Sequence, residues 1–336
     1  MKRIGFEVRK LTEDDLSFAP SCYKDDKAEL TRHLNWCLIF SKEDKNPYFY
    51  MRNMEPDHYR WGGIVRLADG PLLPHTSIHY QDLAQGSDAV CHYRKIADSP
   101  ITYRINSEAP FSEFTYKEAE AHWKEGDILE LQAEYFPYAI FVHTDSPQKI
   151  DYWHQFVILK GKYHGEEIKT LGCFDRLFSP KEKRVETVKE ATTYIWSYFS
   201  GIREDGRKEC AYANIHERNG HGVGFYWLEG EEPILSDEVY LEAKWHRLSY
   251  TDKDDPTVNF THAVWRFASK EIHCDCQWGS KGFLDKPRLE TIGLSQTYGP
   301  WYEGRAPYKH QMWFNINENM GMTVEKILEM GFEITE

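Results

Sequence analysis

Alternation of apolar and polar side chains along two stretches is the feature that most constrains the fold of this chain. From Leu129 to Tyr135 every second side chain is apolar, and Val239–Trp245 repeats the pattern. Successive side chains of a β-strand point to opposite faces, so a period of two predicts strands with one buried face and one exposed face. The sequence therefore predicts a β-rich protein.

Glycine-containing dipeptides separate many of the strand-like segments. They are Asp69-Gly70, His164-Gly165, Asp205-Gly206, Asn219-Gly220 and Glu229-Gly230. Because two-residue turns with glycine join antiparallel neighbours, these positions predict a meander of hairpins. The sequence has no GxGxxG or Walker-type loop and no alternation of strands with long helices. A Rossmann or P-loop fold is therefore disfavoured.

Helical patterns occur only towards the two ends of the chain. Lys27–Phe40 places three leucines and a cysteine near helical spacing, which predicts an amphipathic helix there. Near the C-terminus, Thr323 can cap a short helix that Gly331 ends. We expect both helices to be small additions to the β-structure.

The charge and the cysteine count limit the partners and the compartment. The 336 residues include 41 Lys and Arg against 54 Asp and Glu, a net charge of −13 without a basic cluster, so nucleic acid is not an expected partner. The longest apolar stretch, Tyr135–Val142, falls short of the roughly 20 residues of a membrane span, and the N-terminus lacks the apolar region of a secretory signal. Seven cysteines, an odd number in a long chain, favour reduced thiols. These observations predict a cytoplasmic protein without a membrane span.

A weak internal repeat predicts two similar β-units. Asp127–Tyr135 aligns with Asp237–Trp245, and His154 aligns with His262, at offsets of 108 to 110 residues. Chance similarity between alternating strands can imitate such a repeat. The charged segment Pro180–Glu190 is the predicted linker. The expected organisation is an N-terminal helical or irregular segment (1–50), two β-domains (51–182 and 183–318), and a C-terminal helix and tail (319–336).

The segment from Asp151 to Ser179 resembles a known family. The tandem lipocalin-like proteins of the hydroxyneurosporene synthase (carotenoid hydratase) and AttH type have a strand, a glycine-containing turn and a second strand that ends in a motif of glycine, aromatic, Asp, Arg or His, and aromatic. That motif is similar to Gly172, Phe174, Asp175, Arg176 and Phe178 here.

The resemblance covers about residues 60 to 316, and Tyr194–Tyr198 and Gln296–Trp301 are similar to elements of the second barrel. Phe178 stands where the family usually has Trp, and the first 50 residues have no counterpart. The resemblance implies two lipocalin-like antiparallel β-barrel or sandwich units in tandem and a cavity for a hydrophobic small molecule. In the hydratase branch it also implies acid-catalysed addition of water to a double bond.

Three residues are candidates for proton transfer. A carboxylic acid in an apolar pocket keeps its proton because burial disfavours its charged form. Asp175 is the first candidate for the proton donor or its orienting partner, and Arg176 would tune it electrostatically. His154 lies in an aromatic run and could move protons near neutral pH. The alternatives are an Asp–Arg pair that joins strand ends and a hydrogen-bonded core histidine.

Aromatic residues make up 15% of the chain, with 11 Trp and 21 Tyr, and such an excess can line a ligand cavity. Trp196 and Tyr198, two positions apart, should share one strand face. Tyr298 and Trp301 lie in a loop with Gly and Pro, and Tyr152 is next to the proton-transfer candidates. We expect these five residues to bind substrate, although packing in the core or at a barrel end also explains them.

The 15 histidines offer some possible metal ligands. His273-Cys274-Asp275-Cys276, the pair His216 and His221, and the pair His75 and His79 are the candidate groups, but none has the paired spacing of an established zinc site. The prediction is therefore no cofactor, with zinc as a minor alternative.

The sequence predicts an all-β, tandem lipocalin-like protein that acts without a cofactor. The expected activity is proton transfer on a hydrophobic or polyphenolic small molecule, such as a terpenoid, as a hydratase, cyclase or isomerase. One alternative is a carbohydrate-active protein that uses carboxylate pairs such as Glu130 and Glu134, Glu229 and Glu231, or Asp254 and Asp255. A second alternative is a carrier of hydrophobic ligands. Substrate, reaction direction and oligomeric state stay open.

Overall fold

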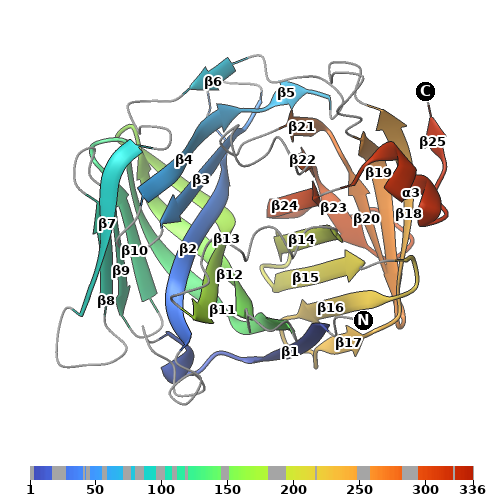
Figure 1. The fold of residues 1–336 in the computed structure, drawn as a ribbon, viewed down its shortest axis with the longest axis horizontal. Coiled ribbons are helices and arrows are strands. Elements are labelled where there is room, and N and C mark those ends of the chain that lie inside the picture. The colour runs from blue at the N-terminus through green and yellow to red at the C-terminus, as the bar shows by residue number, and fades with distance from the viewer. Residues whose placement is uncertain are drawn as a thin grey trace. The chain divides into compact units, whose positions relative to one another are not determined.

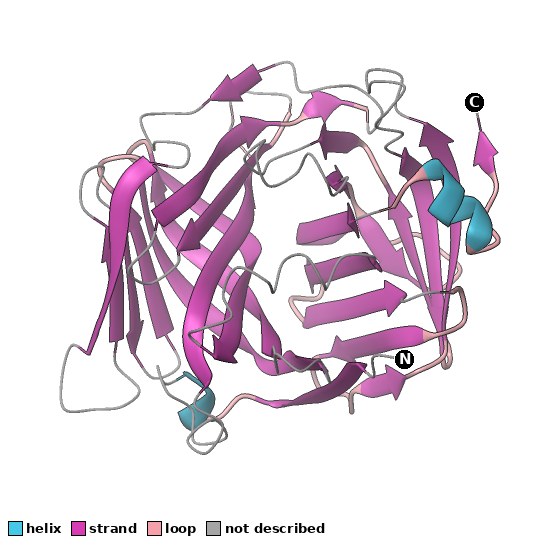
Figure 2. Cartoon of the chain, in the orientation of Figure 1, coloured by secondary structure: helices cyan, strands magenta, loops and turns pink. Residues whose placement is uncertain are grey.

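The protein is all-β, as predicted, and it is described by a computed structural model. The described residues are 4–16, 28–40, 42, 46–54, 59–70, 77–79, 87–95, 103–107, 112–117, 120–144, 151–180, 194–215, 218–247, 258–281, 294–320 and 322–335. Among them, strands dominate, and helices are limited to one 3-10 turn (Asp14–Leu16) and the short α3 (Val324–Glu329) (Figure 2). The chain divides into two compact units, residues 1–39, 49–64 and 79–190, and residues 40–48, 65–78 and 191–336.

Unit 1 is built on one antiparallel sheet whose strands are coloured blue to green in Figure 1. The path runs β11-β10-β9-β8-β7-β4-β3-β2-β13-β12, and β11 also pairs with β12, so the sheet closes on itself. Its strands are β1 (Ile4–Lys10), β2 (Ala28–Ile39), β3 (Tyr48–Met54), β4 (Tyr59–Arg66), β6 (Ser77–His79), β7 (Ser87–Lys95), β8 (Tyr103–Ser107), β9 (Ser112–Lys117), β10 (Glu120–Glu125), β11 (Leu129–Thr144), β12 (Asp151–Tyr163) and β13 (Glu166–Pro180).

Side chains from strands that are not neighbours meet inside the closed sheet and identify its inner face. The ring of Trp123 on β10 lies 6.3 Å from Phe174 on β13 and 5.1 Å from Tyr50 on β3, although neither strand is a neighbour of β10. His33 on β2 lies 5.3 Å from Phe114 on β9 in the same way. These aromatic side chains therefore fill the inside of unit 1, and alternation along β13 places Phe174 and Arg176 inside and Asp175 on the outer face.

A buried ion pair accompanies these aromatic rings. Arg52 Nε donates to Glu125 Oε1 at 3.0 Å, and neither side chain is exposed to solvent. Trp123 Nε1 donates to the same carboxylate oxygen at 3.0 Å. Burial and the nearby cation of Arg176 hold the pKa of His33 well below its usual range, so this histidine is neutral. The interior of unit 1 thus combines aromatic packing with a small set of paired polar groups.

Unit 2 consists of two sheets, coloured mainly yellow to red in Figure 1. The strands of the larger sheet, in spatial order, are β17 (Ile234–Ser236), β16 (Gly222–Leu228), β15 (Lys208–Ile215), β14 (Tyr194–Arg203), β24 (His310–Met320), β22 (Leu294–Tyr298), β21 (Trp278–Lys281) and β5 (Ala68–Asp69). Those of the smaller sheet are β23 (Trp301–Glu303), β20 (Lys270–Asp275), β19 (Val258–Phe267), β18 (Val239–Arg247) and β25 (Ile334–Thr335).

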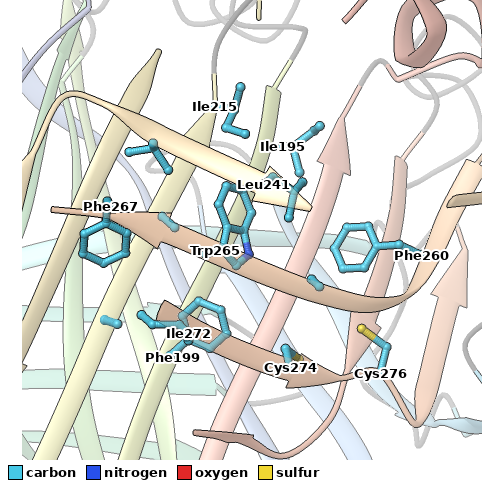
Figure 3. Packing of buried hydrophobic residues seen from close by; sticks show 14 of the residues in the cluster. Ile195, Phe199, Ile215, Leu241, Phe260, Trp265, Phe267, Ile272, Cys274 and Cys276 are labelled. Carbon is cyan, nitrogen blue, oxygen red and sulfur yellow. The ribbon is translucent and has the colours of Figure 1, made fainter. Parts of the chain in front are cut away.

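The core of unit 2 lies between these two sheets (Figure 3). Ile195 and Phe199 of β14 pack with Leu241 of β18, Trp265 of β19 and Ile272 of β20, and all five side chains are buried. Ile327 of α3 belongs to the same cluster, so the terminal helix covers part of this core. As predicted, Thr323 caps α3 by accepting a hydrogen bond from the Lys326 backbone N–H, and Gly331 follows the helix with φ 88°.

The predicted strands and most of the predicted turns are confirmed. Along β11 and β18 buried and exposed residues alternate as expected. His164-Gly165 joins β12 to β13, Asp205-Gly206 joins β14 to β15, and the other two glycine dipeptides of unit 2 also lie between neighbouring strands. Asp69-Gly70 ends β5, and the residues that follow it are not described.

The helix predicted at Lys27–Phe40 is wrong, because Ala28–Ile39 forms strand β2. The side chains from His33 to Ile39 are all buried, which means that both faces of this strand are covered. A strand buried on both faces shows no alternation in its sequence, and chance spacing of leucines can then imitate a helix. The N-terminal segment 1–50 is consequently not a helical addition: it supplies strands β1, β2 and the start of β3.

The observed units differ in their bounds from the predicted domains. Residues 40–48 and 65–78 belong to unit 2 although they lie in the first part of the chain. Most of the predicted linker, Pro180–Glu190, lies outside the described residues. In the described part of the chain, no helix has the length and apolar character that crossing a membrane requires.

Candidate functional site

Three of the predicted site residues meet on the outer face of β12 and β13 in unit 1. His154 Nδ1 lies 2.8 Å from Asp175 Oδ1, and Tyr152 Oη donates to Asp175 Oδ2 at 3.0 Å. Cys173, which was not predicted, donates from Sγ to Asp175 Oδ1 at 2.9 Å. Asp175 is 0% exposed and His154 is 4% exposed. A buried carboxylate is thus hydrogen-bonded to an imidazole, a phenol and a thiol.

The hairpin turn determines this arrangement. In the β12–β13 hairpin the paired residue numbers add up to a constant, from Tyr163 opposite Glu166 next to the turn to His154 opposite Asp175. Directly opposed side chains on one face of an antiparallel pair lie about 5 Å apart, so histidine and aspartate can bond. The predicted turn at His164-Gly165 would have been enough to foresee the pair, and Cys173 follows because it is two positions from Asp175.

The side chains of Arg176 and Asp175 point to opposite faces of β13, because the two residues are consecutive in the strand. Its guanidinium donates to the backbone carbonyl of Asp15. The guanidinium carbon also lies 5.0 Å from the ring centre of Trp153 and 5.6 Å from that of Phe178. Arg176 therefore belongs to the interior of unit 1, and its sequence neighbour Asp175 does not.

Unit 2 contains another histidine–aspartate pair, and its histidine, His262, is the residue that the internal repeat aligns with His154. His262 lies opposite Asp275 in the β19–β20 hairpin, with Nδ1 2.9 Å from Oδ1. The geometry matches that of His154 and Asp175, but here the two side chains are 44% and 63% exposed. Pairs of this kind thus occur both buried and exposed, and His143 and Asp151 form another across β11 and β12, with Nδ1 3.1 Å from Oδ1.

Trp196, Tyr198 and Tyr298 lie in unit 2 on the face of the larger sheet that points away from the core, and all three are buried. Trp196 and Tyr198 share this face, as their spacing predicts. Tyr198 packs against Phe314 with ring centres 5.8 Å apart, and Trp196 stacks with Tyr212 at 6.2 Å. The shared face is confirmed, and the role of these residues as a wall of a ligand cavity stays a prediction.

A buried carboxylate on this aromatic face was missed. Glu318 of β24 is 3% exposed, and it accepts hydrogen bonds from Trp196 Nε1 at 2.9 Å and from Gln296 Nε2 at 2.6 Å. Tyr298 Oη donates to Gln296 Oε1 at 2.8 Å, which extends the network. The alternation Phe314, Ile316, Glu318 puts this acid in an apolar row, and that pattern could have identified it.

Trp301 is separate from the other wall residues. It is buried in the core of unit 2, where its ring lies 5.4 Å from Phe199 and its Nε1 donates to the Ser200 carbonyl at 3.1 Å. This placement fits the packing alternative for Trp301.

The metal-ligand groups suggested by the sequence do not converge in the described residues. Along β20 and the residue after it, Cys274 and Cys276 point into the core, whereas Asp275 is exposed and His273 stacks on Tyr302 with ring centres 4.7 Å apart. Burial raises the pKa of the Cys274 thiol well above its usual range. His221 is exposed, and His75, His216 and the side chain of His79 lie outside the described residues.

A second buried carboxylate in unit 2, Glu209, is fully paired. Arg203 donates to both its oxygens at 2.8 and 2.6 Å, Tyr226 donates at 2.6 Å, Tyr308 donates at 2.6 Å, and His310 Nε2 lies at 3.0 Å. Burial alone would raise the pKa of Glu209, but the hydrogen bonds from these partners outweigh it and hold the pKa at about 2. A carboxylate held so strongly in its charged form is suited to joining strands and not to donating a proton.

This pairing predicts acid sensitivity of unit 2. The folded-state pKa of Glu209 is below its ordinary value of 4.5, so its contribution is complete above pH 4.5 and decreases as the pH falls towards 2. The shift corresponds to about 3 kcal/mol of unfolding free energy. The free energy of unfolding of unit 2, measured in urea between pH 7 and pH 3, should fall as the pH decreases in the natural protein, because part of the Glu209 contribution is lost. In Glu209→Gln the pH dependence should be flatter, and equal slopes for both proteins would contradict the assignment.

A hollow of about 480 Å³ lies on the surface of unit 1, over β9 to β13. Its lining includes Glu120, His122, Glu130, Lys160 and Lys162, and no aromatic residue is among the side chains that line it. This hollow therefore differs from the aromatic-lined cavity that the sequence predicts.

No protein-family model matches the sequence, and no curated protein matches it either. The solved structures to which the chain is similar include the following three. One is a protein of Nitrosomonas europaea described as an AttH candidate, with 13% identity, a TM-score of 0.41, and coverage of 88% of this chain and 93% of that one. Kievitone hydratase of Nectria haematococca has 8% identity, a TM-score of 0.34 and coverage of 86% and 89%.

The third structure, CghA, has 9% identity, a TM-score of 0.35, and coverage of 86% of this chain and 88% of that one. The AttH type named from the sequence motifs is thus represented among the structures to which this chain is similar.

Proposed function

We propose that this protein is an enzyme that transfers a proton to or from a hydrophobic small molecule, as a hydratase, cyclase or isomerase. The observation that carries the proposal is the pair of His154 and Asp175, joined at 2.8 Å and almost completely buried. Imidazole is the usual side chain for general acid–base catalysis. The pairing of His154 with a carboxylate fixes the orientation of the ring.

In this proposal His154 exchanges the proton and Asp175 orients it. Because Asp175 Oδ1 contacts Nδ1, the other ring nitrogen, Nε2, is the atom that would exchange a proton with the ligand. Tyr152 and Cys173 hold the carboxylate in place. Arg176 has no part in this step, because it is on the opposite face of β13.

The aromatic face of unit 2 supports a hydrophobic ligand. Trp196, Tyr198 and Tyr298 carry large apolar ring faces. Glu318 adds a carboxyl group within this face, hydrogen-bonded to the neutral donors Trp196 and Gln296. A terpenoid or a polyphenol fits such a surface better than a highly charged metabolite does.

Isotope exchange tests the proposal before the substrate has been identified. The protein is incubated in D₂O with a panel of unsaturated terpenoids and polyphenols, and each compound is analysed by mass spectrometry. Proton transfer predicts that deuterium enters at least one compound at carbon, since the transferred proton comes from solvent. Native mass spectrometry of protein purified from its host identifies further compounds for the panel.

The same measurements separate the alternatives. A compound that binds but never gains deuterium or changes mass would identify a carrier and contradict the enzyme proposal. The carbohydrate-active alternative has less support, because Glu130 and Glu134 are exposed on β11 and Glu229 and Glu231 lie at a surface turn. Asp254 and Asp255 are outside the described residues.

A further inference from the structure

A third potential metal ligand completes the cluster around Asp175. His154 Nδ1, Cys173 Sγ and a carboxylate oxygen of Asp175 all lie within 4.8 Å of one another. The three side chains are 4%, 1% and 0% exposed. Clusters of exposed acidic side chains are common in proteins that bind no ion there. A buried cluster of an imidazole, a thiol and a carboxylate is uncommon and needs a physical explanation.

The strand geometry suits a chelate. Cys173 and Asp175 are two positions apart on β13, so they share one face, and His154 lies directly opposite Asp175 on β12. Two ligands from one strand and one from its hydrogen-bonded neighbour are held by the regular sheet and not by a loop. Their positions are therefore fixed before any ion arrives, which lowers the cost of binding.

We propose that His154, Cys173 and Asp175 form a binding site for a divalent transition-metal ion of the Zn²⁺ type. Thiolate and imidazole select zinc over magnesium or calcium, which prefer oxygen ligands only. Three protein ligands leave the fourth tetrahedral position open to water or to an anion. Tyr152 donates to the second oxygen of Asp175, as an outer-sphere group that orients a ligating carboxylate does.

This inference goes beyond the proposed function. Coordination through Nδ1 needs the lone pair of that nitrogen, so the proton that joins Nδ1 to Asp175 Oδ1 moves to Nε2, and the thiol of Cys173 releases its proton to solvent on binding. Proton exchange through His154 and ion binding therefore exclude each other. The ion would act as an inhibitor of the metal-free enzyme.

Cobalt provides a direct readout of the ligand set. The full-length protein is freed of metal with a chelator and titrated with Co²⁺ near pH 7.5. The site predicts one equivalent of bound cobalt, visible absorption of the strength of a four-coordinate ion, and a thiolate-to-cobalt charge-transfer band in the near ultraviolet. Zn²⁺ should abolish both signals by displacement. A folded protein that shows neither band would overturn the proposal.

Variants assign the ligands. Cys173→Ser should abolish the charge-transfer band, and Tyr152→Phe should weaken Zn²⁺ binding roughly 10- to 100-fold. Two controls should bind cobalt as the natural protein does: Asp275→Asn, which changes the exposed histidine–aspartate pair, and Cys276→Ser, which changes another buried cysteine.

If Cys173→Ser does not fold, X-ray absorption of the cobalt-loaded natural protein still decides, because a first shell without sulfur contradicts the site. The outcomes are separable from those of the proposed function. If the natural protein exchanges no deuterium into any compound, the proposed function fails, but the cobalt titration can still show the metal site. If the titration shows no cobalt site, the metal proposal fails, but the exchange measurement still tests the proposed function.

Discussion

Asp175→Asn is expected to lower the rate of deuterium exchange into a ligand by about 10²- to 10⁴-fold, the usual contribution of a positioned acid–base group. Asparagine has nearly the same shape, but it is neutral and gives His154 no carboxylate to orient its ring. It also offers Nδ1 an amide whose orientation is not fixed by charge. The measurement is the exchange rate at saturating ligand, so that weaker binding does not enter the comparison.

The exposed pair supplies a matched control. Asp275→Asn makes the same chemical change opposite His262, in a pair of nearly equal geometry. The control should keep the natural rate within about a factor of two, since surface substitutions have small effects. Equal losses in the two variants would show that the buried pair has no special role, and an unchanged rate in a folded Asp175→Asn protein would remove His154 and Asp175 from the mechanism.

Arg52→Met is expected to destabilise unit 1 by about 3–5 kcal/mol, because it leaves Glu125 as an uncompensated buried charge. Two units need not unfold together, so amide hydrogen exchange in β3 and β10 is a better probe than a single unfolding midpoint. The loss corresponds to exchange about 10²- to 10⁴-fold faster in these strands. Strands of unit 2, such as β15, serve as the internal reference.

A compensating variant tests the reason for this loss. In the double variant Arg52→Met with Glu125→Gln, the buried charge is gone. Trp123 Nε1, which donates to Glu125 in the natural protein, can donate to the glutamine oxygen instead. The double variant should recover most of the stability, since neutral replacements of buried ion pairs are often tolerated. If it is as unstable as Arg52→Met, then packing of the arginine and not its charge accounts for the effect.

Much of the fold could be predicted because local patterns determine it. Alternation identified β11 and β18, and the turn at His164-Gly165 fixed the hairpin that brings His154 to Asp175. Strand β2 could not be predicted in this way, because its burial on both faces depends on partners that are distant in the sequence. The alternative of a direct Asp175–Arg176 pair is not what the structure shows, since neighbours in a strand sequence are on opposite sides of the sheet.

The candidate site shows the same limit. Trp196 and Tyr198 could be placed on one face from their spacing, but Glu318 is joined to them only through the pairing of β14 with β24. Cys274 and Cys276 of unit 2 were predicted as possible metal ligands because they are close to each other in the sequence. Cys173 was not, because its potential partner His154 lies on a different strand. Register between strands, and not residue type, decides which side chains can act together.

Strand β5 ties the two halves of the sequence together in a way that matters for dissecting the protein. Its residues, Ala68 and Asp69, pair with β21 at one margin of the larger sheet of unit 2. A fragment that starts at Ala191 would lack this strand, and β21 would present unsatisfied backbone groups to other molecules. A fragment that contains only the second half of the chain therefore exposes β21 as an aggregation-prone edge strand. Unit 2 thus depends on residues that the ribosome synthesises before unit 1 is complete.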